Sequence, residues 1–286
     1  MKFFNVFRTK QITCLTSLHP EQYFFMMNRE KSYSAINEKE KKPVCIFAMM
    51  GNAYFSFKQF TVFHDRCAMK TGTDGVLLGA WVEVNRSLTR VLDIGTGSGL
   101  IALMLAQRCD AMIDGIEPHR ESCRQAKENA AASPWSNRIT IIEEDLQTYT
   151  NHRKKTYELI VCNPPYFSRS LKPPEEARQM ARHSDALPPS LLMLHASRLL
   201  SPEGTIALIF PFENKEIFHT AAAAEGLFEK RETLVRTLPP TKPFRVLAEY
   251  TFVPSPIIRD ELCIYNESRD FSREYRELTK DFYLHF

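Results

Sequence analysis

A short apolar stretch ends abruptly in four residues that could do chemistry, Asn163, Pro164, Pro165 and Tyr166. Residues 159–162 are continuously hydrophobic, which is typical of a strand buried on both faces of a sheet. The two prolines cannot donate ladder hydrogen bonds or continue a helix, so the chain must leave the sheet at Asn163. This exit offers an amide, backbone carbonyls and an aromatic ring, which together can bind an exocyclic amine and stack on its planar group. A rigid Pro-Pro turn without function is the alternative interpretation.

A glycine-rich turn seventy residues upstream supplies a second set of candidate residues. Asp93, Gly95, Gly97 and Gly99 lie between a short apolar strand and a helix rich in Leu, Ile, Ala and Met. The glycines permit a tight turn and let the backbone approach a ligand at the helix N-terminus. Dehydrogenases and methyltransferases both use such a turn. The Asp93 carboxylate would stand where a pyrophosphate binds, so a cationic or amine-bearing ligand suits the turn better.

Two further acids end the next two predicted strands. Glu117 follows Gly95 by 22 residues, a spacing that matches a carboxylate holding a ribose diol. Asp145 could accept a hydrogen bond from an adenine amino group, or it could be a solvated strand end. Upstream of both, Thr73 or Asp74 is expected to be the N-cap of a helix.

The segment after Tyr166 is irregular, contains proline and is locally basic. It is the best candidate for a loop that contacts phosphates. Its cationic residues are Arg169, Lys172, Arg178 and Arg182. Two glutamates in the same segment, Glu175 and Glu176, could instead pair with these arginines.

Composition limits the class of protein. The 286 residues are 44% hydrophobic and 25% charged, which is ordinary for a globular protein, and no run approaches the ~18–20 apolar residues of a membrane helix. The seven cysteines include no CxxC pair, which indicates no disulfide framework and favours a reducing, cytoplasmic setting. The eight histidines show no ligand spacing, so no metal site is indicated. The net charge of +3 combines about +4 in residues 1–50 with about −1 in residues 51–286, so the body is not a generally basic nucleic-acid binder.

The order of predicted elements defines the domains and the fold class. Residues 1–50 lack periodicity and are expected to be a disordered extension or the product of an over-called start codon, with a substrate-gripping arm as the alternative. Residues 51–286 are expected to form a single domain. Strands and helices alternate from residue 91 to about 215, strands over 234–238 and 245–253 follow, and a short amphipathic helix lies within 271–286. This order predicts an α/β fold with a doubly wound, mostly parallel sheet and an antiparallel last strand.

As a set, the Asp93 glycine turn, Glu117, Asp145 and the Asn163 to Tyr166 motif resemble class I S-adenosylmethionine-dependent methyltransferases. The resemblance implies a Rossmann-like, seven-stranded sheet. This family uses Asn-Pro-Pro-Tyr to methylate planar amines: adenine N6, guanine N2 or a glutamine side-chain amide. Flanking stretches are similar to the branch that makes N6-methyladenosine at position 37 of a valine tRNA; these are residues 64–70, 71–75, 133–135, 178–182 and 281–284. The resemblance covers residues 52–286.

The resemblance also implies a cofactor, a partner and a role for each site residue. The cofactor is S-adenosylmethionine and the partner is tRNA, with no obligate protein partner. The glycine turn approaches the methionine part of the cofactor near Asp93, Glu117 takes the ribose hydroxyls, and Asp145 with the Leu146 backbone takes the cofactor adenine. Thr73 and Asp74 wall the donor pocket. The Asn163 side chain and the Pro164 carbonyl accept the two protons of the target amine, while Tyr166 stacks on the target base.

Three other functions are open at this stage. Another branch of the same family would methylate guanine N2 of rRNA or glutamine N5 of a release factor; residues 64–81 and the aromatic C-terminus disfavour it. A nicotinamide oxidoreductase is disfavoured by Asp93 and by the Asn-Pro-Pro-Tyr motif. An RNA-binding module with an inactive methyltransferase fold is disfavoured by the presence of Asn163 and Glu117.

Overall fold

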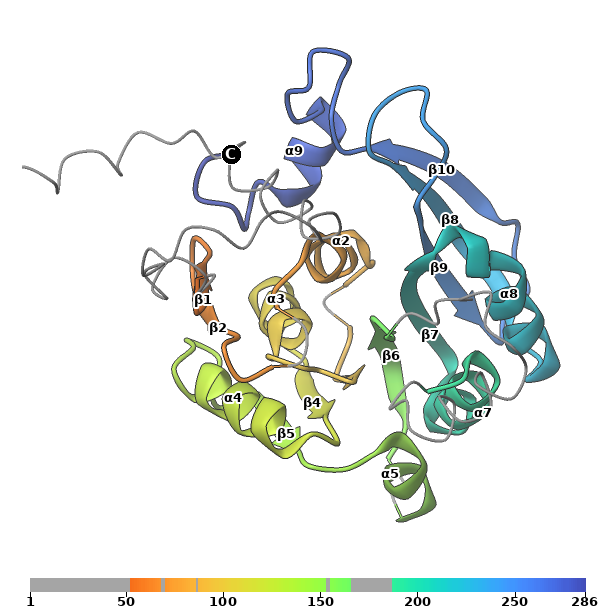
Figure 1. Ribbon diagram of the computed structural model, residues 1–286. Coiled ribbons are helices and arrows are strands. Elements are labelled where there is room, and N and C mark those ends of the chain that lie inside the picture. Colours follow the sequence, from red (N-terminus) through yellow and green to blue (C-terminus); the bar gives the residue numbers. More distant parts are fainter. Residues whose placement is uncertain (1–51, 68–69, 86, 153–154, 166–186) are drawn as a thin grey trace, which may run out of the picture. The chain divides into compact units, whose positions relative to one another are not determined.

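The computed structural model describes residues 52–67, 70–85, 87–152, 155–165 and 187–286. The chain divides into two units, Met1–Met49 and Met50–Phe286, and all described residues belong to the second unit. Its centre is an eight-stranded sheet in the order β10-β8-β9-β7-β6-β3-β4-β5 (Figure 1). The strands are β3 (Arg90–Ile94), β4 (Met112–Ile116), β5 (Ile139–Ile142), β6 (Tyr157–Cys162), β7 (Leu200–Pro211), β8 (Phe228–Arg236), β9 (Arg245–Thr251) and β10 (Ile258–Cys263).

The directions of the strands confirm a mostly parallel sheet. Strands β5, β4, β3, β6 and β7 pair in parallel, whereas β9 pairs antiparallel with both β7 and β8. Two expectations are corrected. The described sheet has eight strands rather than seven, because β10 pairs in parallel with β8. The last strand of the chain is therefore β10, and the antiparallel strand β9 lies between β7 and β8. Strand β8 also begins at Phe228, six residues before the predicted start.

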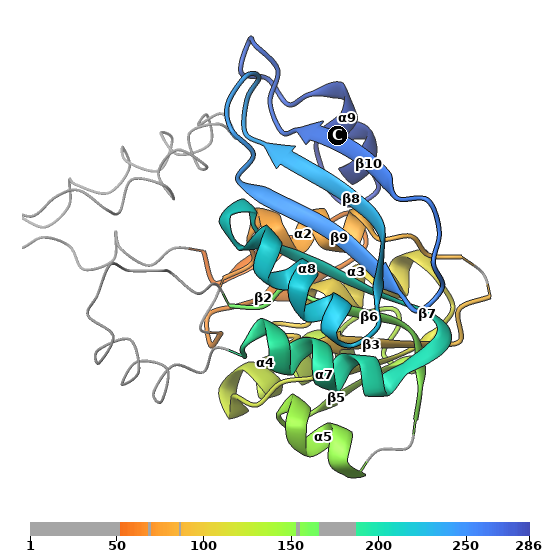
Figure 2. The same ribbon diagram turned by 90° about the vertical axis from the view of Figure 1, so that its right-hand side faces the viewer.

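Helices cover both faces of this sheet (Figures 1 and 2). On one face lie α2 (Thr73–Trp81), α3 (Leu100–Arg108), α4 (Arg120–Ala131) and α9 (Arg273–Thr279), and on the other lie α5 (Leu146–His152), α7 (Pro189–Leu199) and α8 (Lys215–Ala224), which follows the 3-10 turn η2 (Phe212–Asn214). Each face of the sheet has its own hydrophobic core, and β6 contributes to both. Leu159 and Val161 pack in the core on the α2, α3, α4 and α9 side, and Ile160 and Cys162 pack in the core on the α5, α7 and α8 side. Burial on both faces was the expectation for this strand, and it is confirmed.

A two-stranded hairpin lies outside the main sheet. Its strands are β1 (Tyr54–Ser56) and β2 (Thr61–Phe63), joined by a turn in which the Phe57 N–H donates to the Phe60 carbonyl at 2.8 Å. Phe57 and Phe60 are buried, and Phe60 meets Trp135 edge-on. The C-terminal segment closes over this turn, because Lys58 Nζ donates to the Lys280 and Phe286 carbonyl oxygens. A short helix within residues 271–286 was predicted, and α9 confirms it.

Within the described residues, no helix is both long and apolar enough to cross a lipid bilayer.

Candidate functional site

The predicted site residues leave the sheet together because of strand register. Ile142, Ile116, Ile94 and Cys162 are partners along one rung across β5, β4, β3 and β6. The residues that follow each of them therefore emerge side by side at the carboxyl edge of the parallel strands, which is where such sheets bind ligands. Gly95 follows Ile94, Glu117 follows Ile116, and Asn163 follows Cys162. The glycine turn thus lies between the Glu117 segment and the Asn163 segment.

The glycine turn is held open by backbone conformation. Gly95, Gly97 and Gly99 have φ of +67°, +57° and +83°, a left-handed region that residues with a Cβ rarely adopt. A Cβ built on Gly95 would meet no atom within 4 Å, so there is open space above the turn. The Gly95 and Thr96 N–H groups donate to the Ile116 carbonyl at 2.9 and 3.0 Å, which locks the turn to β4.

Asp93 lies fully buried beneath this turn. Its Oδ2 accepts hydrogen bonds from Thr96 Oγ1 at 2.6 Å and from the Ala102 N–H at 3.2 Å. Its Oδ1 is also buried and has no partner among the described residues. Burial raises the pKa of this carboxyl to about 7. A buried oxygen without a partner favours a ligand that brings a donor to it.

Glu117 is buried against the top of the same turn. One carboxylate oxygen accepts from the Gly97 N–H at 2.9 Å, and the other accepts from the His119 N–H at 3.0 Å. These two bonds fix the direction of the side chain beside the open space above Gly95, where a ribose diol was expected.

Asp145 caps helix α5. Its two oxygens accept from the Thr148 N–H at 2.9 Å and from Thr148 Oγ1 at 2.7 Å, and the side-chain bond from Thr148 lowers the pKa of Asp145. Leu146 begins α5, where the helix itself leaves the N–H groups of its first turn unpaired. The predicted contact of Asp145 and Leu146 with the cofactor adenine stays a prediction; the structure adds that the same carboxylate caps the N-terminus of α5.

The expected N-cap of α2 is wrong. Gly72 is the N-cap, Thr73 is the first helical residue, and Asp74 lies in the first turn. Asp74 instead pairs with Arg245, the first residue of β9, at 3.0 Å between Oδ2 and Nε. Arg245 is the register partner of Pro211 at the end of β7, which lies next to β6. This ion pair therefore ties α2 to the sheet edge on the side of Asn163, and sequence spacing gave no signal for it.

The Asn-Pro-Pro motif is described as far as Pro165. Asn163 is half-buried, Pro164 is buried and Pro165 is exposed directly after β6. Tyr166 and the basic residues Arg169, Lys172, Arg178 and Arg182 lie outside the described residues, so their predicted roles stay predictions.

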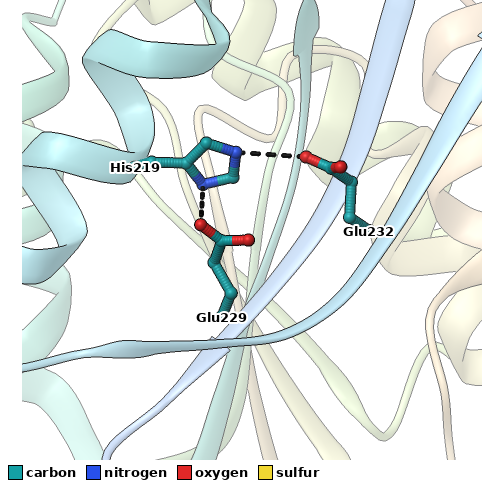
Figure 3. A group of neighbouring side chains, drawn as sticks. All are labelled: His219, Glu229 and Glu232. Atoms are coloured by element: carbon teal, nitrogen blue, oxygen red, sulfur yellow. Dashed lines mark hydrogen bonds and ion pairs between the residues drawn. The ribbon is translucent and has the colours of Figure 1, made fainter. Parts of the chain in front are cut away.

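A polar cluster on α8 and β8 carries the side-chain types that bind metals (Figure 3). His219 Nδ1 lies 3.1 Å from Glu229 Oε1, and Nε2 lies 3.1 Å from Glu232 Oε2. The two carboxylates face different ring nitrogens, and both already face cations: Lys215 Nζ is 2.8 Å from Glu232, while Arg259 lies 3.7 and 3.9 Å from Glu229 and Glu232. The contacts therefore form a charge-balanced ion-pair network among α8, β8 and β10.

Sequence reasoning also missed two buried polar residues on α4. Gln125 and Asn129 are 0% and 2% exposed, on the helix face that also carries Cys123, Ala126 and Ala130. Asn129 accepts from the N–H of Phe63, the last residue of β2, and Gln125 accepts from the N–H of Arg66 in the segment that follows β2. Their positions among the apolar residues of this helix face were the sequence feature that could have indicated buried polar contacts.

Comparison with known proteins agrees with this geometry. Residues 71–210 match the family model of the methyltransferase small domain. A predicted O-methyltransferase from Agrobacterium tumefaciens has a similar fold, with a TM-score of 0.56, 21% identity, and coverage of 73% of this chain and 96% of that one. Among relatives, the tRNA1(Val) (adenine(37)-N6)-methyltransferase of Phocaeicola vulgatus is 48% identical over 235 residues, covering 82% of this chain and 99% of the relative. The protein of the same name from Parabacteroides distasonis is 47% identical over 236 residues, covering 82% and 99%.

Fold and site together define a class I, Rossmann-like methyltransferase that uses S-adenosylmethionine. The residues fit this cofactor: the open space above Gly95 admits a ligand against the backbone, and the Asp93 and Glu117 carboxylates suit its amine and hydroxyl groups. At 48% identity over nearly the whole length of a relative, the chain belongs to the family of tRNA1(Val) (adenine(37)-N6)-methyltransferases.

Proposed function

We propose that this protein transfers a methyl group from S-adenosylmethionine to N6 of an adenine in tRNA, at position 37 in the anticodon loop of a valine tRNA. The names of the relatives support the substrate and the position. The observation that carries the proposal is the shared rung Ile94–Cys162, which sets Asn163 directly beside the glycine turn. A tRNA substrate also favours action in the cytoplasm.

The chemistry follows from the electronic structure of the target amine. The N6 lone pair of adenine is delocalised into the ring, so this nitrogen is a poor nucleophile. The Asn163 side-chain oxygen and the Pro164 carbonyl would accept hydrogen bonds from the two amino protons, which favours positive charge on the nitrogen during attack. This contribution is positioning and electrostatic stabilisation rather than proton abstraction.

Other residues hold the two reactants. When bound, S-adenosylmethionine supplies an electrophilic methyl group on a sulfonium. Asp93 and the glycine turn hold its methionine part, Glu117 holds its ribose, and Asp145 with the Leu146 N–H holds its adenine, while Thr73 and Asp74 wall the donor pocket. Tyr166 stacks on the target base once that base has left the loop stack, and Arg169, Lys172, Arg178 and Arg182 contact phosphates.

The test is transfer of labelled methyl groups to bulk tRNA, followed by nucleoside analysis. We expect N6-methyladenosine from the unaltered protein and none from Asn163→Ala, with cofactor affinity retained in the variant. Asn151→Ala, which removes an exposed asparagine on α5, is the matched control and should retain activity. A folded Asn163→Ala protein that has lost cofactor binding would contradict the assigned role. Methylated guanine in RNA, or methylated glutamine in protein, would contradict the assigned substrate.

A further inference from the structure

The outward face of the β1–β2 hairpin exposes two aromatic rings. Tyr54 and Phe63 are register partners on the two strands, and their ring centroids lie 5.6 Å apart. They are 51% and 47% exposed, whereas Val62, which points to the other side, is fully buried. Cross-strand aromatic pairs can stabilise a hairpin, but that role does not require both rings to remain half open to solvent.

A buried asparagine fixes this ring pair relative to the donor site. Asn129 Oδ1 accepts from the Phe63 N–H at 3.0 Å, and its Nδ2 donates to the Phe63 carbonyl at 2.8 Å. The same Nδ2 also donates to the carbonyl of Ser98 in the glycine turn at 2.8 Å. One side chain therefore links Phe63 directly to the turn above Asp93. Figures 1 and 2 show the orange hairpin beside α4, which carries Asn129.

The chain that follows Phe63 is fixed to the same helix. Gln125 accepts from the Arg66 N–H at 2.9 Å and donates to Asp65 Oδ1 at 2.7 Å, and Arg66 forms an ion pair with Glu128. The hairpin and its exit are thus held to α4 at several points, so the ring pair has a defined place next to the site.

The charge around the hairpin is complementary to a nucleic acid. Residues 52–70 and 119–132 contain six lysines and arginines against three acids, within a domain whose net charge is about −1. The cations are Lys58, Arg66, Lys70, Arg120, Arg124 and Lys127. Arg66 pairs with Glu128 and Arg124 with Glu121, so the two segments together carry an excess of three positive charges. Flat exposed rings set among cations are the combination that binds unpaired nucleotides, because rings stack on bases while cations neutralise phosphates.

We propose that Tyr54 and Phe63 form a stacking platform for unpaired tRNA nucleotides adjacent to the target adenine. This inference rests on the proposed function and extends it to the surface that holds the RNA. Removing the target base from its stack leaves its neighbours without a stacking partner on one side. The rings replace that partner, so the platform holds the opened loop while Asn163 engages the adenine.

The experiment measures RNA binding and turnover separately in the full chain. The variants are Phe63→Ala, Tyr54→Ala and the conservative Phe63→Tyr, and the matched control is Phe228→Ala, a phenylalanine 48% exposed on the distant strand β8. Binding of a synthetic anticodon stem–loop RNA is followed by fluorescence anisotropy at several salt concentrations, alongside methyl-transfer kinetics and cofactor affinity.

Each alanine variant should weaken RNA binding roughly five- to 150-fold, the range for one lost base stack. The loss should appear in KM for RNA, with kcat and cofactor affinity unchanged, and Phe63→Tyr should restore binding. Stacking releases no counterions, so the salt slope should stay the same in Phe63→Ala but become shallower in Lys127→Ala.

Three results would overturn the platform. RNA affinity of Phe63→Ala equal to that of Phe228→Ala would show that the rings do not touch RNA. A change in solution mass rather than RNA affinity would assign the face to self-association. RNA affinity that is lost together with cofactor affinity would assign the rings to folding. Stem–loop binding without any methyl transfer by the unaltered protein would instead contradict the proposed function, because binding is measured independently of turnover.

Discussion

At the residue scale, Asp93 shows how burial and ligand choice are connected. Its carboxylate has one oxygen engaged by Thr96 and Ala102 and one oxygen without a partner among the described residues. Burial, with a smaller contribution from the nearby Glu117 charge, raises the pKa of Asp93 from 3.8 to about 7. A cation brought to Oδ1 favours the charged form, so cofactor binding and proton release from Asp93 are coupled.

This coupling predicts a pH dependence with a definite sign. The folded protein holds a proton on Asp93 that the unfolded chain releases between pH 3.8 and about 7, so this group's contribution to the free energy of unfolding falls as pH rises through that window. Cofactor affinity should rise over the upper part of the same window, because the carboxylate is the binding form.

Asp93→Asn separates these two effects. At pH 8 it should weaken cofactor binding about ten- to a hundred-fold, the range for a lost hydrogen bond to a charged group, without lowering the melting temperature. The variant should also lose the rise in affinity between pH 6 and pH 8. Isothermal titration and thermal melts at both pH values measure this, and unchanged affinity in Asp93→Asn would rule out the assigned contact.

The sequence predicted the residues of this sheet edge better than their local roles. Asp93, Glu117 and Asn163 could be placed because a strand end followed by glycine or proline is a local signal. In the structure Asp93 lies one residue before the rung formed by Ile94, Ile116 and Cys162, and Glu117 and Asn163 lie one residue after it. The capping role of Thr73 and Asp74 was wrong because Asp74 pairs with Arg245, which is 171 positions away. Such an ion pair depends on the order of the strands in the sheet, and short-range sequence patterns do not indicate that order.

At the element scale, β10 was missed because it has no apolar alternation. Ile258, Arg259, Asp260 and Glu261 are all exposed, and the strand is defined by backbone pairing with β8. Ion pairs reinforce that pairing: Arg231 lies 3.4 Å from Asp260, and Arg236 lies 3.0 Å from Glu261. A strand whose side chains stay in solvent has no periodic hydrophobic signal to read.

The His219 network should contribute to stability through its buried carboxylate. Glu232 is 3% exposed and its carboxylate faces both His219 and Lys215, so Glu232→Gln leaves the Lys215 charge without its partner and should cost about 3 kcal/mol of unfolding free energy. Urea unfolding measures this. Glu121→Gln, which breaks an exposed ion pair with Arg124, is the control and should cost less than about 1 kcal/mol.

A chelator experiment tests whether the His219, Glu229 and Glu232 cluster holds a metal ion. The charge balance predicts that a chelator leaves the melting temperature of the unaltered protein where it was. A drop that zinc or manganese reverses would show that the cluster holds an ion.

At the scale of the whole molecule, we propose that residues 1–50 are dispensable. The chain divides between Met49 and Met50, and the relative with 48% identity aligns to 82% of this chain while 99% of its own length is covered. A protein comprising residues 51–286 should therefore retain the melting temperature, the cofactor affinity and the methyl transfer of the full chain. Loss of RNA affinity alone on truncation would instead identify residues 1–50 as an arm that binds RNA.

The packing of the hairpin has a spectroscopic consequence. The chain contains two tryptophans, and the fold places them in separate environments. Trp81 is buried on α2, donates to Thr233 at 2.9 Å and lies under the Arg231 guanidinium, whereas Trp135 meets Phe60 in the hairpin turn. The intrinsic fluorescence of the protein therefore has two sources, one against strand β8 and one at the base of the hairpin, and quenching of one source does not report on the other.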